Sequence, residues 1–313
     1  MPMNRPARFR TLALAALLGC GMAMDAAAAP RPNIVLVLTD DLDRASARTM
    51  PELQALARRG TSFEAAYAIT PMCAPSRATI LTGKYPQNTG VRSNRLPAGG
   101  YETFYQRGQE AETFAVWLQR AGYRTALIGK YINWYPDSAG ALHIPQGWTR
   151  WVTPATELEI HAKYNYHLNE DGVAVAYGRT PADYSTDVYA RKALEFIDAA
   201  AAARAPFALV LSLAAPHLPE TPAPRHVGLF PDATAPRSPS FPELDVSDKP
   251  SFLRFPPLPQ DKLDEIDRRY RLRLEMLRSV DEALGGIRQR LAEHGLLEST
   301  YIVFTSDHGW HQG

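Results

Sequence analysis

The stretch Met72–Arg77 (MCAPSR) places a sulfur nucleophile, Cys73, four residues before a cation, Arg77. The only other cysteine in the sequence is Cys20, which lies in an N-terminal segment with the character of an export signal. An exported chain that loses this segment keeps Cys73 without a disulfide partner in an oxidising compartment. Cys73 is therefore either a small buried apolar residue, which is common, or a residue with special chemistry.

Further reactive side chains stand at the ends of four apolar runs. Asp40 and Asp41 end the run NIVLVLTDD, Lys130 ends TALIGK, His217 follows FALVLSL, and Asp307 with His308 ends YIVFTSDH. In open α/β sheets, ligands bind beyond the carboxyl ends of the parallel strands. A single residue of this kind is commonly an ordinary loop residue, but four sets at the same edge indicate a shared site. The carboxylate oxygens among them suit a divalent cation.

The elements that must position these residues alternate between strand-like and helix-like patterns. We expect strands at Asn33–Asp40, Thr125–Lys130, Phe207–Leu213 and Tyr301–Asp307. We expect helices at Pro51–Arg59, Ala111–Ala121, Asp187–Ala200 and Pro259–Glu293, the last of them broken near Gly285-Gly286. This alternation predicts an α/β fold with a mainly parallel central sheet flanked by helices.

Two local features refine this picture. Pro75 suits the first turn of a helix, so we expect Cys73 near a helix N-terminus, where backbone N–H groups favour an anion. Between Pro216 and Pro259 the prolines are dense and no periodicity survives. A long excursion of this kind is typically a functional lid or rim.

Composition and the N-terminus restrict the class of protein. The 313 residues are 45% hydrophobic, which is enough for a large core, and the formal net charge of +1 argues against a nucleic-acid partner. Residues 1–29 combine three arginines, the apolar run Leu12–Leu18 and a run of small residues, which predicts a cleaved signal peptide and no transmembrane segment. We therefore expect a periplasmic or secreted protein. The stretch Leu17–Cys20 resembles a lipoprotein cleavage box and leaves open whether Cys20 is lipidated.

The segment Cys73–Arg77, followed by Leu81–Gly83 (LTG), resembles the signature of the type I sulfatases, which belong to the alkaline phosphatase superfamily. The resemblance continues through the four strand-end motifs and covers Asn33–Gly313, so it implies a catalytic domain over residues 30–313. Within the family, the stretches TDDLD, GKYINWY, HIPQGW and DYSTDV are most similar to the glucosamine-6-sulfatases.

This resemblance implies a mechanism. A maturation enzyme converts the motif cysteine, here Cys73, to formylglycine, and one oxygen of its hydrate attacks sulfur while the other later expels sulfate. Arg77 and Lys130 match the positions that hold the oxidised cysteine and the sulfate, and His217 matches the general acid that faces the leaving oxygen.

The resemblance also implies a metal site formed by Asp40, Asp41, Asp307 and His308, together with Cys73 itself. Many relatives have asparagine where this chain has His308. The expected ion is Ca²⁺, with Mn²⁺ or Zn²⁺ as alternatives because imidazole is a softer ligand than an amide oxygen.

Two departures from the family pattern stand out. Several sulfatases place a histidine two residues after the lysine as the base that helps to release sulfate, whereas this chain has Ile132 there; His311 is our candidate for that role. The family also continues beyond the position of Gly313 with more sheet, a second sulfate-binding lysine and a smaller domain, so we expect the C-terminal part to be missing here.

We therefore expect hydrolysis of a sulfate ester on a sulfated sugar, with a 6-sulfated N-acetylglucosamine unit as the substrate. The alternatives are a phosphomonoester or phosphonate-ester hydrolase of the same superfamily and a truncated, inactive protein that binds sulfated glycans. The aromatic residues Tyr131, Trp134, Tyr135, Trp148, Trp151, Tyr164 and Tyr166 are equally consistent with a glycan-binding rim and with core packing.

Overall fold

The computed structural model of the chain describes residues 1, 31–238, 241, 243 and 245–312. It separates Met1–Arg31 from a compact unit, Pro32–Gly313. The predicted signal peptide and Cys20 lie outside the described residues, except for Met1. Within the described residues, no helix combines the length and the apolar character that crossing a bilayer requires.

The centre of the unit is a seven-stranded sheet in the order β5-β4-β3-β2-β6-β1-β7. Its strands are β1 (Asn33–Thr39), β2 (Arg124–Gly129), β3 (Arg150–Pro154), β4 (Tyr166–Glu170), β5 (Val173–Tyr177), β6 (Phe207–Ser212) and β7 (Thr300–Ser306). The strands β3, β2, β6, β1 and β7 pair in parallel, while β4 and β5 extend the sheet in antiparallel fashion. The predicted mainly parallel sheet and its four predicted strands are confirmed.

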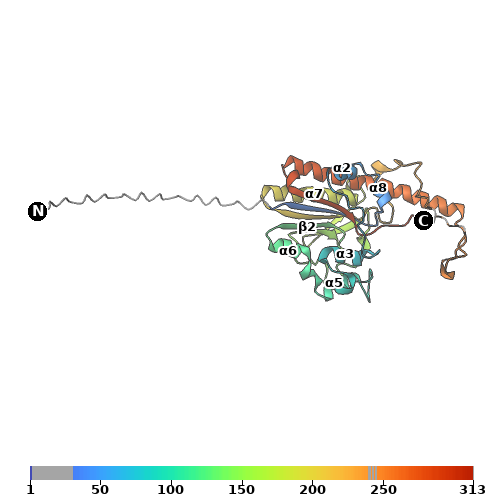
Figure 1. The fold of residues 1–313 in the computed structure, drawn as a ribbon, viewed down its shortest axis with the longest axis horizontal. Helices are drawn as coiled ribbons and strands as arrows, with labels where there is room; N and C mark the ends of the chain where they lie inside the picture. The colour runs from blue at the N-terminus through green and yellow to red at the C-terminus, as the bar shows by residue number, and fades with distance from the viewer. Residues whose placement is uncertain (2–30, 239–240, 242, 244, 313) are drawn as a thin grey trace. The chain divides into compact units, whose positions relative to one another are not determined.

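Helices cover both faces of the sheet (Figure 1). The helices α2 (Pro51–Arg59), α7 (Ser185–Ala202) and α8 (Gln260–Glu293) lie over one face, and α3 (Cys73–Thr82), α5 (Gly100–Gln106) and α6 (Phe114–Arg120) lie over the other. Two shorter helices, α1 (Arg44–Ala47) and α4 (Pro86–Thr89), complete the connections. Each face has its own apolar core, because the interior strands bury side chains on both sides.

Two expectations about helices need correction. The helix predicted at Ala111–Ala121 is shorter, because Thr113 is extended and separates α6 from a 3₁₀ turn at Gln109–Glu112. The predicted break near Gly285-Gly286 is absent, since α8 runs without interruption from Gln260 to Glu293.

Tertiary packing explains why α8 stays continuous. A Cβ atom at position 285 would lie only 3.0 Å from Cγ of Glu52 in α2. The backbone N–H groups of Glu52 and Leu53 donate to the carboxylate of Asp281 at 3.1 and 3.0 Å, which fixes α2 against α8. Glycine therefore permits close helix contact, and the packing outweighs its cost of about 1 kcal/mol in a helix.

The remaining expectations concern irregular and aromatic segments. In the described part of Pro216–Pro259, 3₁₀ turns occur at Pro224–His226 and Ser251–Leu253, which agrees with the absence of periodicity. Most of the aromatic residues are core: Tyr131, Tyr135, Trp148, Trp151 and Tyr166 are buried. Trp134 and Tyr164 are partly exposed and remain available to a ligand.

Candidate active site

The carboxyl ends of four parallel strands bring the predicted residues together. Leu38 of β1 pairs with Ser212 of β6, Thr39 pairs with Ser306 of β7, and Gly129 of β2 pairs with Ser212. The residues that follow these positions therefore emerge at one edge of the sheet. The expectation of a shared edge is confirmed.

Gly129 is the residue that allows Lys130 to reach this edge. Its φ of +107° lies outside the range that side chains favour. A Cβ atom there would lie 1.9 Å from the carbonyl oxygen of Ser212, so the backbones of β2 and β6 approach each other only because position 129 has no side chain.

Three carboxylates form the centre of the site. Asp40, Asp41 and Asp307 are all buried, and each offers an oxygen within 4.8 Å of the other two. Burial, reinforced by the charge of Asp40, raises the pKa of Asp41 to about 6 and also raises the pKa of Asp307. Among the described residues, Oδ1 of Asp40 is buried without a hydrogen-bond partner. Closely spaced carboxylates with a buried oxygen that accepts no hydrogen bond fit a divalent cation, which needs several hard oxygen ligands.

Two buried cations border this cluster. Nζ of Lys130 lies 2.6 Å from Oδ2 of Asp40, and Nε of Arg77 donates to Oδ2 of Asp307 at 2.9 Å. Burial alone would raise the pKa of Asp40, but the nearby Lys130 and Arg77 hold that pKa well below its usual value. The site thus combines an ionised carboxylate, Asp40, with fixed positive charge.

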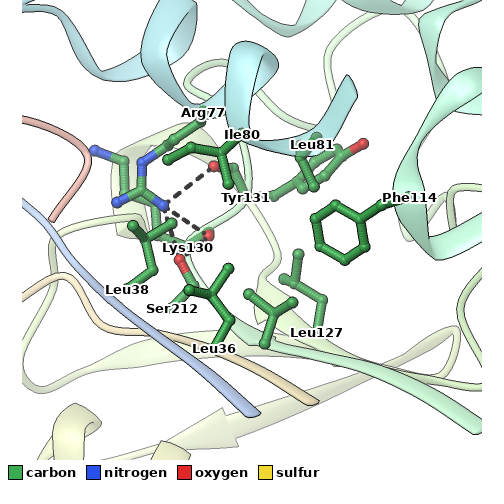
Figure 2. A pocket seen from close by; sticks show the side chains of 11 residues that line it. Leu36, Leu38, Arg77, Ile80, Leu81, Phe114, Leu127, Lys130, Tyr131 and Ser212 are labelled. Atoms are coloured by element: carbon green, nitrogen blue, oxygen red, sulfur yellow. Dashed lines mark hydrogen bonds between the residues drawn. The ribbon is translucent and has the colours of Figure 1, made fainter. Parts of the chain in front are cut away.

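The guanidinium of Arg77 is held between the helix and the sheet. Its Nη1 donates to Oγ of Ser212 at 2.7 Å and to the carbonyl oxygens of Lys130 and Tyr131 at 3.1 and 3.5 Å, as the dashed lines in Figure 2 show. The gap that these residues line is mainly apolar and measures about 10 Å³, at the lower limit for one water molecule. Figure 2 therefore shows how Arg77 is anchored, and this gap is too small to admit a substrate.

Cys73 is the first residue of α3, and its side chain is buried. Arg77 follows four residues later, on the same side of the helix. Sγ of Cys73 lies 3.4 Å from Nε2 of His308, and the backbone N–H of Ala74 donates to Oδ1 of Asn94 at 2.9 Å. Burial raises the pKa of the Cys73 thiol to about 12. The thiol is therefore protonated at neutral pH and is a poor nucleophile as it stands.

Two of the predicted histidines face the carboxylates. Nε2 of His308 lies 3.2 Å from Oδ1 of Asp41, and Nε2 of His217 lies 3.6 Å from Oδ2 of the same residue. Nδ1–H of His217 donates to the carbonyl oxygen of Leu218 at 2.6 Å, which directs Nε2 toward the site. Burial, assisted by the charge of Lys130, lowers the pKa of His217 to about 4.

His161 also belongs to this cluster, although no motif in the sequence marks it. Its Nε2 lies 3.1 Å from Nζ of Lys130 and 3.2 Å from Oδ2 of Asp40, and its ring stacks on that of His217 with 3.7 Å between centroids. Burial and Lys130 lower the pKa of His161 to about 3, so the ring is neutral at pH 7.

The surrounding loop explains both the position of His161 and why it escapes prediction. Lys163 is buried, and its Nζ donates to the carbonyl oxygens of His161 and His217 at 2.9 and 3.5 Å, which ties the two loops together. The only sequence signal is a histidine two residues before a lysine in an irregular segment. His311, by contrast, is exposed, and within the described part of the chain its side chain makes no hydrogen bond or ion pair to the cluster.

This chain is similar to proteins of one known family. The family model described as Sulfatase matches residues 32–313. The N-acetylglucosamine-6-sulfatase of Homo sapiens is 37% identical to this chain over 323 residues, which cover 100% of this chain and 57% of the human protein. The chain thus spans little more than half the length of that relative.

Solved structures agree with this match. A protein solved in complex with its substrate D-glucosamine-2-N,6-O-disulfate has a TM-score of 0.68 at 26% identity, covering 90% of this chain and 66% of its own. A phosphonate monoester hydrolase from Silicibacter pomeroyi has a TM-score of 0.62 at 22% identity, covering 89% and 63%, and shows the fold alone. The length of the family match and the identity to the human relative show that the chain belongs to the sulfatase family.

Proposed function

We propose that this chain belongs to an exported sulfatase that hydrolyses a sulfate ester on a sulfated sugar. In this proposal residues 1–29 are a cleaved signal peptide and residues 30–313 belong to the catalytic domain. The observation that carries the proposal is the buried cluster of three carboxylates and two cations beside Cys73, in a chain of the sulfatase family. Fixed charges in a buried site are suited to stabilising the charge on a sulfuryl group.

A divalent cation is part of this proposal. Asp40, Asp41, Asp307 and His308 are the residues that would hold it, with residue 73 at their border. The carboxylate oxygens favour Ca²⁺, while the imidazole of His308 is a ligand that Mn²⁺ or Zn²⁺ also accepts. When bound, the ion supplies positive charge that polarises the sulfuryl oxygens.

Conversion of Cys73 to formylglycine by a maturation enzyme is the second part. When formed, this group supplies a hydrated aldehyde with one oxygen for attack on sulfur and a second for the release of sulfate. The protonated thiol described above is unsuited to that attack. Arg77 is fixed by Asp307 and Ser212, so it offers its charge at residue 73 without reorganisation.

The histidines complete the proposed site. Nε2 of His217 is directed toward the carboxylates and is placed to protonate the leaving sugar oxygen. An anionic ester beside the ring raises the pKa of His217 from its low value by charge attraction, which is the direction that a general acid needs. His161 lies against Lys130, and we assign it to holding the ammonium of Lys130 toward the sulfate.

The identity of the sugar rests on the relatives. The human relative is an N-acetylglucosamine-6-sulfatase, and the solved structure holds a 6-O-sulfated glucosamine. We therefore propose a 6-sulfated N-acetylglucosamine unit as the substrate. The phosphoesterase alternative is not better supported, because the phosphonate monoester hydrolase shares the fold alone.

The test combines a mass measurement with an activity measurement. The chain is expressed with a formylglycine-generating enzyme, the peptide that contains residue 73 is weighed, and release of sulfate from 6-sulfated N-acetylglucosamine is followed. We expect the aldehyde mass and sulfate release that Cys73→Ala abolishes. The matched 6-phosphate ester serves as the control for the phosphoesterase alternative.

Three results contradict the proposal. A peptide that carries only thiol, together with full activity of Cys73→Ala, overturns the mechanism. Preference for the phosphate ester overturns the reaction. Tight binding of the sulfated sugar by the aldehyde-bearing chain without any turnover supports the inactive glycan-binding alternative instead.

A further inference from the structure

A second pocket lies at α5, on the α3 side of the sheet. Its volume is about 260 Å³, and the residues that line it are Arg95, Leu96, Gly99, Gly100, Glu102, Trp134 and Asp137. Ligand pockets for drug-sized molecules start at about 300 Å³. This pocket, which we call the Trp134 pocket, is therefore of a size for one sugar ring and not for an extended chain.

One hydrogen bond beside the Trp134 pocket reaches the helix that carries Cys73. Asn94, which precedes Arg95, accepts a hydrogen bond from the backbone N–H of Ala74 at 2.9 Å, directly beside Cys73. Trp134 follows Lys130 by four residues. Asn94 and the chain that follows Lys130 therefore link the pocket to the candidate active site.

The walls of the pocket are fixed before any ligand binds. Gly100 N donates to the carbonyl oxygen of Ser93 at 2.9 Å, and a Cβ atom at Gly99 would lie 1.8 Å from that same oxygen. On the other wall, Trp134 has a φ of +70°, a conformation that is rare and costly for a bulky side chain. Its backbone N–H donates to Glu157, which holds that conformation. Strained residues of this kind concentrate at ligand sites.

The polar groups of the pocket are available to a ligand. Within the described residues, the side chains of Arg95 and Asp137 form no hydrogen bond or ion pair. Glu102 uses Oε1 to accept from Gln106 at 2.8 Å and keeps Oε2 for another donor. The indole of Trp134 is partly exposed, and aromatic faces are suited to stacking on an apolar face of a ligand.

The charged side chains of the Trp134 pocket indicate which kind of sugar ring it would bind. Two carboxylates, Glu102 and Asp137, stand against one guanidinium, Arg95. Carboxylates accept hydrogen bonds from hydroxyl and ammonium groups and repel sulfates and carboxylates. We propose that the Trp134 pocket binds the sugar ring linked to the one that carries the ester, and that this ring is uncharged or bears an amine. This inference rests on the proposed function, because it treats the ligand as the same sulfated glycan.

Binding to the unconverted chain tests this inference without requiring catalysis. Two disaccharides are compared by calorimetry: both carry 6-sulfated N-acetylglucosamine, and the second ring is a neutral hexose in one and a uronic acid in the other. We expect the neutral form to bind more tightly. Asp137→Asn should weaken binding of the neutral form about tenfold, the loss expected when a hydrogen bond to a charged group is removed.

Three variants complete the experiment. Trp134→Ala should weaken the neutral form as well, whereas Trp117→Ala, which removes an exposed tryptophan in α6, should have no effect. Asp137→Asn has nearly the same shape as the parent, so it tests the pocket even if Trp134→Ala fails to fold. Arg95→Gln should leave the preference for the neutral ring in place.

The outcomes separate the pocket from the proposed function. Tighter binding of the uronic acid form, lost in Arg95→Gln and strengthened in Asp137→Asn, would mean that the pocket takes an anionic ring and would overturn the inference. Unchanged affinity in Trp134→Ala and Asp137→Asn would overturn it too. Failure of the aldehyde-bearing chain to release sulfate rejects the proposed function but leaves this binding preference measurable.

Discussion

Replacement of Arg77 by methionine tests whether the buried charges of the site hold the fold together. Arg77 is buried, as is Asp307, which it contacts at 2.9 Å, and Nη2 lies 3.5 Å from Oδ1 of Asp40. Arg77→Met keeps much of the side-chain volume but leaves Asp307 without its cation. Breaking a buried pair by removing one partner costs about 3–5 kcal/mol.

We expect the free energy of unfolding to fall by an amount in the upper part of that range. Arg77 also donates to Ser212 and to the carbonyl oxygen of Lys130, and both acceptors are buried. For a domain of this size, a loss of about 4 kcal/mol corresponds to a fall of about 10 °C in the midpoint temperature of thermal unfolding. Lys130 remains beside Asp40, so Asp307 is the carboxylate that loses most.

Urea unfolding at pH 7, followed by circular dichroism in the absence of divalent cations, measures this loss. The control is Arg290→Met, which breaks the partly exposed pair with Asp198 and should leave the urea concentration at the unfolding midpoint unchanged. If Arg77→Met unfolds within about 1 kcal/mol of the parent, the cost of an unpaired buried carboxylate has been overestimated and the reasoning fails.

Three further outcomes follow from the same structure. The pKa of Asp41 is raised from 3.8 to about 6 in the folded state, so the folded chain binds this proton more tightly than the unfolded chain does. Stability from this group should therefore fall by about 3 kcal/mol in total as pH rises from well below 3.8 to well above 6 in the presence of chelator. Addition of Ca²⁺ should reduce the fall, and a flat urea-unfolding profile would contradict this. Gly129→Ala should yield little folded protein on expression, because its Cβ would meet the carbonyl oxygen of Ser212, and a normally folded product would refute the close approach of β2 and β6. Gly286→Ala should raise the free energy of unfolding by about 0.5–1 kcal/mol, because the nearest atom to the new Cβ is Leu194 Cδ1 at 4.0 Å; a destabilised variant would show that α8 needs glycine there.

The predictable part of the fold is the part whose apolar runs are continuous. β1 and β6 are interior strands of the sheet, and their sequences NIVLVLT and FALVLS indicate this directly. The sequence does not predict β3, β4 and β5, because each has only five residues, and β4 and β5 also have exposed positions. The continuity of α8 depends on how α2 packs against it, and periodicity along one chain segment does not report such a contact.

The residues of the candidate site could also be predicted only in part. Residues that end parallel strands could be grouped from the sequence, because parallel strands share one edge. His161 could not, because an irregular loop carries it to Lys130 and no repeating pattern marks the position. The role of the aromatic residues is ambiguous for a related reason. Trp151 is buried in the core whereas Trp134 lines a pocket, and the residue type alone does not indicate which of the two is buried.

The order of the strands along the chain determines how late in synthesis the site can form. β1 pairs with β7, whose residues come more than 260 positions later, so Asp307 cannot meet Arg77 until almost all of the described chain has been made. Contacts of such long range form slowly. Cys73 is buried once they have formed. Any enzyme that modifies its sulfur therefore competes with folding, and the yield of modified protein should depend on how long the nascent chain stays open.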